Sequence, residues 1–172
     1  MSLRPGRGAV IGLILVLAGC SASLPFVASP TTEGPRQLTV IAVDRASGDI
    51  KISRVVAAVD SGEAVNPDGI RNQIEGGIVQ SLSWTIHEAV TFDATHRSSF
   101  DWSAYPIVRF DAVPATVEVH VIDRPGQPFL GTGEAAQGPA AAALANAVTD
   151  AVALRVRDMP LSPEKVKAVL RS

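Results

Sequence analysis

The stretch NPDGIRNQIEGGIVQSLSWTI, residues 66–86, decides the fold of this chain. Asn66 can cap free helix amides with its side chain, and Pro67 suits the first helical position because it has no amide to satisfy. Apolar residues then recur every four positions, which predicts a helix with one buried face. These residues are Ile70, Ile74, Ile78, Leu82 and Ile86. A helix of this kind needs an apolar surface to cover.

Segments on both sides of the helix supply that surface. Residues 37–44 and 50–60 are rich in β-branched side chains, and the short turn between them contains Ser and Gly, so they predict two hairpin strands. Residues 116–123 alternate valines with polar side chains, which is typical of a half-buried strand. We expect a further strand at residues 87–92.

The C-terminal part of the chain predicts a loop and two more helices. Residues 124–138 contain several glycines and prolines and no periodicity, which indicates an extended loop. Pro139 begins a second long helix, through roughly Arg155, that is small or apolar almost all round. Ser162 caps a short last helix that ends near Arg171. The sequence therefore predicts an α+β domain, with a small mixed or antiparallel sheet, two long packed helices and a short C-terminal helix.

Composition limits the classes of function. With 172 residues, 47% of them hydrophobic, the chain has room for one modest domain. A formal net charge of -2 gives no basic field for nucleic acid. A single cysteine, Cys20, excludes an internal disulfide framework, a cysteine-ligated iron–sulfur cluster and a cysteine-rich zinc site. The three histidines are too scattered for a metal motif, so we predict no metal ligands in this chain.

The first twenty residues have the layout of an export signal. Arg4 and Arg7 precede an apolar run at residues 9–19, which is too short to cross a bilayer as a lasting helix. The run ends in LAGC, which resembles the lipobox of bacterial lipoproteins and would make Cys20 a lipidated mature N-terminus.

We therefore divide the chain into a signal at 1–20, a flexible linker at 21–36 and a domain at 37–172. This division predicts a cell-envelope protein, either anchored in the membrane through Cys20 or periplasmic. An ordinary export signal is an alternative for residues 1–20. A start assigned in the wrong place is another, and it would make the chain cytoplasmic or a non-functional fragment.

One loop brings backbone amides and an acid together. The sequence GTGEAAQGP, residues 131–139, is a glycine-rich turn leading into a helix, which suits an anion or a developing negative charge. Its carboxylate, Glu134, is either a catalytic base or an ordinary acid near a helix start. The loop also fits GxGxxA, but prolines precede it where a dinucleotide site needs a core strand. Gly76 and Gly77 in the first helix indicate close approach, by tight packing or by a ligand.

Three blocks carry a family resemblance: residues 58–92, residues 101–110 (DWSAYPIVRF) and residues 131–148. They resemble the C-terminal portion of the large molybdenum-binding subunit of the xanthine oxidase family, and within it the isoquinoline and nicotinate dehydrogenase branch. In that family a molybdenum ion on a pterin cytosine dinucleotide adds a water-derived hydroxyl to an electron-poor carbon, and a glutamate acts as base. The resemblance implies that Glu134 is this base, and that Gln73 and Gly133 belong to the cofactor site.

The resemblance also implies what the chain would need from elsewhere. Relatives of this kind are several hundred residues long, so the remaining large-subunit domains would complete the pocket. A small subunit would hold the 2Fe-2S clusters, because this chain has no place for an iron–sulfur cluster and is expected to hold no flavin. The substrate would be an N-heteroaromatic compound or an aldehyde. The alternative is a non-catalytic exported or lipid-anchored binding or assembly module that keeps the fold. Ser61 stands where cysteine is frequent in the family, and we interpret it as structural.

Overall fold

The computed structural model describes residues 9–16 and 36–171, which build a four-stranded mixed sheet and three helices. The strands lie side by side in chain order: β1 (Ala9–Val16), β2 (Arg36–Asp44), β3 (Ile50–Asp60) and β4 (Thr116–Ile122). The first three strands are antiparallel, whereas β4 runs parallel to β3. A parallel pair needs a long crossover connection, and α1 (Pro67–Ile86) lies in that connection.

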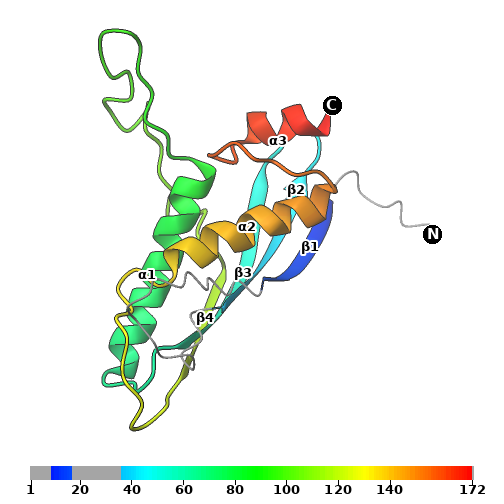
Figure 1. Cartoon of the computed structure of the whole chain (residues 1–172). Helices are drawn as coiled ribbons and strands as arrows, with labels where there is room; N and C mark the ends of the chain where they lie inside the picture. Colours follow the sequence, from blue (N-terminus) through cyan, green and yellow to red (C-terminus); the bar gives the residue numbers. More distant parts are fainter. Residues whose placement is uncertain (1–8, 17–35, 172) are drawn as a thin grey trace, which may run out of the picture.

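The two long helices lie against the sheet. Helix α2 (Gln137–Val152) crosses β1 and β2, and α1 lies next to α2 along β4 (Figure 1). Alternate residues of β2 and β3 are buried in the core that the helices share with the sheet. This core includes Ile41, Val43, Val55, Val59, Ile74, Ile78, Leu82, Leu144 and Val148. Helix α3 (Pro163–Leu170) follows α2 and contributes Val166 to the same core.

The cap signals in the sequence operate as predicted. The Asn66 side-chain oxygen accepts a hydrogen bond from the Gly69 amide at 2.9 Å, and Pro67 is the first residue of α1. The Ser162 hydroxyl likewise accepts from the Lys165 amide at the start of α3. The predicted α+β class is confirmed, as are the two hairpin strands and the long helix that begins at Pro67.

Two details of the prediction are wrong. Residues 87–92 form no strand, and only an isolated bridge joins Phe92 to Arg97. The β-branched side chains there find no sheet edge to pair with and are largely exposed, so tertiary context overrides propensity. Helix α2 begins earlier than Pro139 and ends at Val152, because Ala153 adopts a left-handed conformation with φ of 60°.

The N-terminal predictions stay predictions. The apolar segment assigned to a signal contains β1, which pairs with β2 from Ala9↔Asp44 to Val16↔Gln37. The lipobox at residues 17–20, with Cys20, and the linker at residues 21–35 lie outside the described residues, whereas Arg36 begins β2. Among the helices of the described segments, none has the length and hydropathy of a membrane span.

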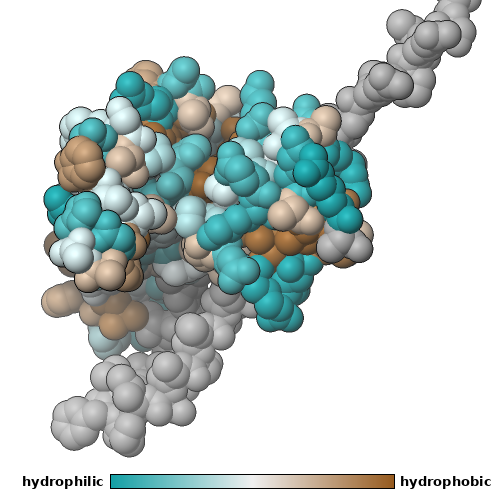
Figure 2. Space-filling view, turned by 90° about the horizontal axis from the view of Figure 1, so that it is seen from above, coloured by the Kyte–Doolittle hydropathy of each residue, from teal (hydrophilic) through white to brown (hydrophobic). Residues whose placement is uncertain are grey.

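A long excursion joins α1 to β4 and projects from the body of the molecule. This 87–115 connection extends beyond the end of α1 (Figure 1), and seen from that end it forms a lobe with apolar side chains among polar ones (Figure 2). The Ser83 hydroxyl donates to Glu88, and the Tyr105 hydroxyl donates to the other Glu88 carboxylate oxygen at 2.8 Å. The Val108 amide donates to Ser83 Oγ at 2.9 Å. These bonds hold the returning part of the connection against α1.

Candidate functional site

Gln73 lies on the second turn of α1 and lines a cavity of about 280 Å³. One side of the cavity consists of the start of α1 and the segment before it, including Ser61 and Asn66. The other side is the middle of the 123–136 loop, including Leu130 and Thr132. The structure therefore brings the predicted glutamine and the glycine-rich loop to one place.

The 123–136 loop is fixed to the end of β3 at its beginning. Arg124 Nε lies 2.6 Å from Oδ2 of the buried Asp60 carboxylate, and the Leu130 amide donates to the Ser61 carbonyl at 2.8 Å. Gly62, the residue after Ser61, has φ of +78°. A Cβ at Gly62 would stand 1.9 Å from the carbonyl oxygen of Pro128, which lies between Arg124 and Leu130 in the loop. Only glycine fits there, because both the backbone conformation and the close approach exclude a side chain.

The far end of the same loop is fixed to α1 where α2 begins. A Cβ on Gly77 would stand 3.2 Å from the Ala136 Cβ, so Gly77 lets the start of α2 pack closely on α1. The Ser81 hydroxyl donates to the Gln137 carbonyl at 2.6 Å, and Gln37 Nε2 donates to the Ala136 carbonyl at 3.2 Å. The close approach at Gly77 is therefore helix packing, whereas Gly76 has no atom within 4 Å of its Cβ position.

Glu134 and Gly133 lie between these two attachments. The Glu134 carboxylate is exposed and has no hydrogen bond or ion pair with the rest of the described chain, whereas its carbonyl accepts from the Gln137 amide at 3.2 Å. Gly133 has open space around its Cβ position. Glu134 does not line the Gln73 cavity, and it does not cap α2, whose N-cap is Ala136 without a side-chain bond. The loop thus presents an unengaged carboxylate two residues after Thr132, which lines the cavity.

The cavity fits the polar edge of an organic cofactor. Ser61 is 3% exposed, and its hydroxyl has no hydrogen-bond partner although its atom is buried. A buried hydroxyl without a partner is unfavourable, so it suits a ligand atom that completes its bonding. The lining contains no lysine or arginine and one carboxylate, Glu63. Gln73, Ser61 and Thr132 could therefore hold neutral polar groups, whereas phosphates would need a cation from elsewhere. The sequence analysis did not identify this role for Ser61.

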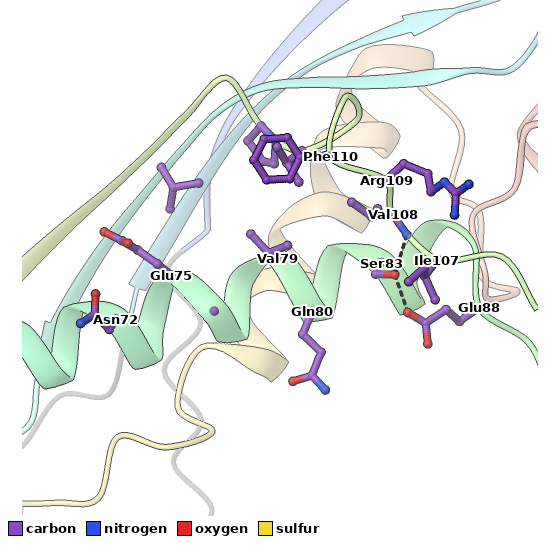
Figure 3. A pocket seen from close by; sticks show the side chains of 14 residues that line it. Asn72, Glu75, Val79, Gln80, Ser83, Glu88, Ile107, Val108, Arg109 and Phe110 are labelled. Carbon is purple, nitrogen blue, oxygen red and sulfur yellow. Dashed lines mark hydrogen bonds between the residues drawn. The ribbon is translucent and has the colours of Figure 1, made fainter. Parts of the chain in front are cut away.

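A second and larger cavity, of about 800 Å³, lies along another face of α1 (Figure 3). Glu75, Val79 and Ser83 come from the helix, and residues 107–117 form the opposite side. We call it the α1 groove. The groove was not predicted from the sequence, although Glu75, Val79 and Ser83 recur at helical spacing beside the buried stripe of α1.

Comparison with known proteins gives consistent relatives. Residues 30–114 match the molybdopterin cofactor-binding domain family. Over 130 residues, 76% of the chain, it is 42% identical to a nicotinate dehydrogenase subunit of Pseudomonas putida. It is 30% identical over 121 residues, 70% of the chain, to the beta subunit of isoquinoline 1-oxidoreductase of Brevundimonas diminuta. The resemblance to the nicotinate dehydrogenase and isoquinoline oxidoreductase branch is thereby confirmed.

Solved structures agree with this result. The fold matches quinoline 2-oxidoreductase from Pseudomonas putida 86 with a TM-score of 0.74 and 25% identity, over 80% of this chain. It matches the aldehyde oxidoreductase from Desulfovibrio desulfuricans with a TM-score of 0.69 and 27% identity, over 78% of this chain. The chain spans 11% of the nicotinate dehydrogenase subunit and 18% of the quinoline oxidoreductase chain, so it corresponds to a small part of each relative.

Proposed function

Residues 30–114 belong to the molybdopterin-binding domain of xanthine oxidase-family molybdoenzymes, and from this premise we propose that the chain contributes the general-base loop of a molybdenum hydroxylase site. The observation that carries the proposal is the placement of the 123–136 loop. Leu130 of the loop is bonded to Ser61, and Ala136 at the end of the loop packs on Gly77; the unengaged Glu134 lies between these two attachments, two residues after Thr132 of the Gln73 cavity.

In this proposal Gln73 and Ser61 hold the cofactor. Its neutral pterin edge would lie in the Gln73 cavity, where the Gln73 amide and the Ser61 hydroxyl supply hydrogen bonds. When bound, the molybdenum cofactor supplies the two-electron chemistry by which a carbon–hydrogen bond is replaced by a water-derived hydroxyl. We propose the cytosine dinucleotide form, whose phosphates would lie outside this cation-free cavity. Gly133 leaves room for close approach of the loop backbone.

Glu134 acts as the general base. A Glu134 carboxylate oxygen accepts the proton released as the hydroxyl is transferred, and its position on a loop fixed at both ends keeps it in one place for that step. Its exposed side faces space that the remaining large-subunit domains would fill.

The remaining parts of the enzyme would lie on other chains or domains. We propose that these are the other large-subunit domains and a small subunit with 2Fe-2S clusters that removes the electrons. The substrate class is an N-heteroaromatic compound or an aldehyde, as the names of the relatives suggest.

The test is Glu134→Gln in a completed complex. The full chain is co-expressed with the P. putida nicotinate dehydrogenase subunit from which the matching segment has been deleted, and with that enzyme's partner subunit. Glutamine keeps the size of the side chain but cannot accept the proton. Because general-base removal typically costs on the order of 10² to 10⁴ in rate, nicotinate-driven reduction of the metal should slow by that range while molybdenum content stays unchanged. Anaerobic single-turnover kinetics measures this rate.

Asp150→Asn is the matched control, because Asp150 is an exposed carboxylate on α2 far along the chain from the loop. It should leave the rate unchanged. A Glu134→Gln complex that reduces its metal at the wild-type rate would contradict the catalytic assignment.

A second candidate is a non-catalytic exported or lipid-anchored module that retains the fold. The LAGC sequence at residues 17–20 favours it, since lipid on Cys20 would anchor the domain in the cell envelope. In that case the full chain would assemble with no large-subunit remainder, and no complex would reduce its metal with nicotinate.

A further inference from the structure

We propose that the α1 groove is a docking site for the remaining part of the large subunit, which inserts a lysine or arginine flanked by apolar residues. The inference rests on the proposed function, because it assumes that such a remainder exists. Glu75 would receive the cation, and Phe110 and Val79 would contact the apolar neighbours.

The groove has the size and walls of a side-chain receptor. The groove, of about 800 Å³, lies between α1 and residues 107–117. Figure 3 shows Val79 pointing from the helix toward Phe110, whereas Glu75, one turn earlier on α1, directs its carboxylate away from Phe110 at the other end of the groove. The opposite side is formed mainly by apolar residues: Ile107, Val108, Phe110, Val113, Pro114 and Val117. The bonds of Ser83 to Glu88 and to the Val108 amide hold that side against α1, so the groove is preformed.

The groove has one unpaired acidic group. Glu75 is half-buried, and within residues 9–16 and 36–171 its carboxylate makes no hydrogen bond or ion pair. Glu88, at the other end, already accepts from Ser83 and Tyr105. Arg109 also lies at that other end, away from Glu75 (Figure 3). Any partner that covers Glu75 removes water from a charge, which is unfavourable unless the partner supplies a cation.

The apolar side of the groove is left uncovered to an unusual degree. Phe110 is 95% exposed, and Ile107 is 37% exposed. Large exposed apolar side chains grouped around a concave surface mark an interaction site, and aromatic residues are enriched in such sites.

The share of the relatives' length that the chain spans supports the choice of this partner. It corresponds to 11% of the nicotinate dehydrogenase subunit and 15% of the isoquinoline 1-oxidoreductase beta subunit, so most of each relative lies outside the matched block. Gln73 lines the cavity and Glu75, two residues later, lines the groove, so the two openings lie on different faces of the same helix. A partner docked at Glu75 would therefore contact the same helix that carries Gln73.

The experiment measures binding of the full chain to the remainder of the P. putida nicotinate dehydrogenase subunit, expressed without its matching segment. Glu75→Lys reverses the charge that the partner must meet, and Phe110→Ser removes an apolar contact from a side chain that supports nothing in the core. We expect each variant to raise the Kd at least about tenfold, since unpaired charges and lost anchors at interfaces typically have effects of this size. Asp150→Lys makes the same charge change on α2 and should bind as the wild type does.

Hydrogen exchange on the wild-type complex is the second readout, and residues 72–83 and 107–117 should gain protection on binding. If the wild type binds the remainder and the Glu75→Lys and Phe110→Ser variants bind it equally well, the docking site is wrong and the proposed function still stands. Wild type that does not bind the remainder would overturn both proposals. The proposal would also be overturned if the chain alone self-associates and Glu75→Lys abolishes this self-association. The groove would then be occupied by a second copy of the chain.

Discussion

Gly62 fixes the loop that carries Glu134 to the end of β3. Its φ of +78° and the Pro128 carbonyl oxygen, 1.9 Å from a Cβ at this position, exclude any side chain. We expect Gly62→Ala to lower the free energy of unfolding by roughly 2–4 kcal/mol, combining left-handed strain with steric overlap. Chemical denaturation of the full chain measures the change.

Gly126 provides a matched control in the same loop. Its φ is +79°, but no atom lies within 4 Å of its Cβ position. Gly126→Ala should therefore show the backbone strain alone, about 1–2 kcal/mol. Equal losses for the two variants would mean that Gly62 is not in close contact with Pro128.

Tyr105 gives a titration that reports on the 87–115 connection. Its hydroxyl donates to the Glu88 carboxylate, which raises the pKa of the phenol above its ordinary value of 10.0. Because folding raises this pKa, the bond stabilises the fold fully below pH 10 and is lost as the pH rises through the raised value. Tyr105 is the single tyrosine, so phenolate absorbance measures its midpoint directly. We expect a midpoint above 10 in the wild type and one nearer 10 in Glu88→Gln; coincident curves would contradict the bond.

Residues whose function depends on other segments could not be predicted from the sequence. The Ser61 hydroxyl is a candidate ligand only because burial leaves it without a partner, and no local pattern encodes that. Gln73 and Glu134 came from the family motif, and the structure adds that Gln73 lines the cavity whereas Glu134 lies outside it. Gly77 had two interpretations in the sequence, and only the position of Ala136 decides for packing.

Among the elements, those with strong local signals were predicted well. Helix α1 combines a capping Asn66, a proline at its first position and a four-residue apolar period, and its bounds follow these signals. The parallel pairing of β4 with β3 and the irregular 87–92 segment depend on which sheet edge is free, which is a tertiary property. The sequence therefore predicts elements here better than it predicts how they pair.

Strand β1 and the predicted signal cannot both persist in one mature chain. Cleavage before Cys20 would remove Ala9–Val16, leaving β2 at the edge of the sheet and α2 without one of the two strands that it covers. A chain that begins at Cys20 should therefore lose a large fraction of the about 5–15 kcal/mol typical of a domain and should self-associate. Denaturation and sedimentation of the two forms test this.

The mass of the protein from its native host decides which fate applies. A lipidated Cys20 terminus would support the envelope proposal, and an intact Met1 would support β1 as a permanent strand. Equal stability of the full and shortened chains would contradict the structural role of β1.

On the scale of the whole molecule, the described residues form a buried core beside two open cavities. The sheet and helices bury their apolar faces against each other, whereas the Gln73 cavity, Glu134 and the α1 groove all open outward. Tight cofactor binding needs groups on several sides, and phosphates need cations that the cavity lining does not contain. We therefore expect the fold to be stable without the cofactor.

We accordingly expect the chain purified alone to retain little molybdenum, well below one atom per chain, and to oxidise no heterocycle. Elemental analysis after expression in a host that makes the cofactor measures the molybdenum content. The melting temperature of the chain should be the same with and without molybdate in the medium, because a ligand that does not bind cannot stabilise the fold. Co-expression with the rest of the nicotinate dehydrogenase subunit is the positive control, since it adds the missing walls and should raise the molybdenum content toward one atom per complex. Stoichiometric molybdenum in the single chain would show that Gln73, Ser61 and the 123–136 loop suffice to hold the cofactor, and the site would then have to be regarded as complete within these 172 residues.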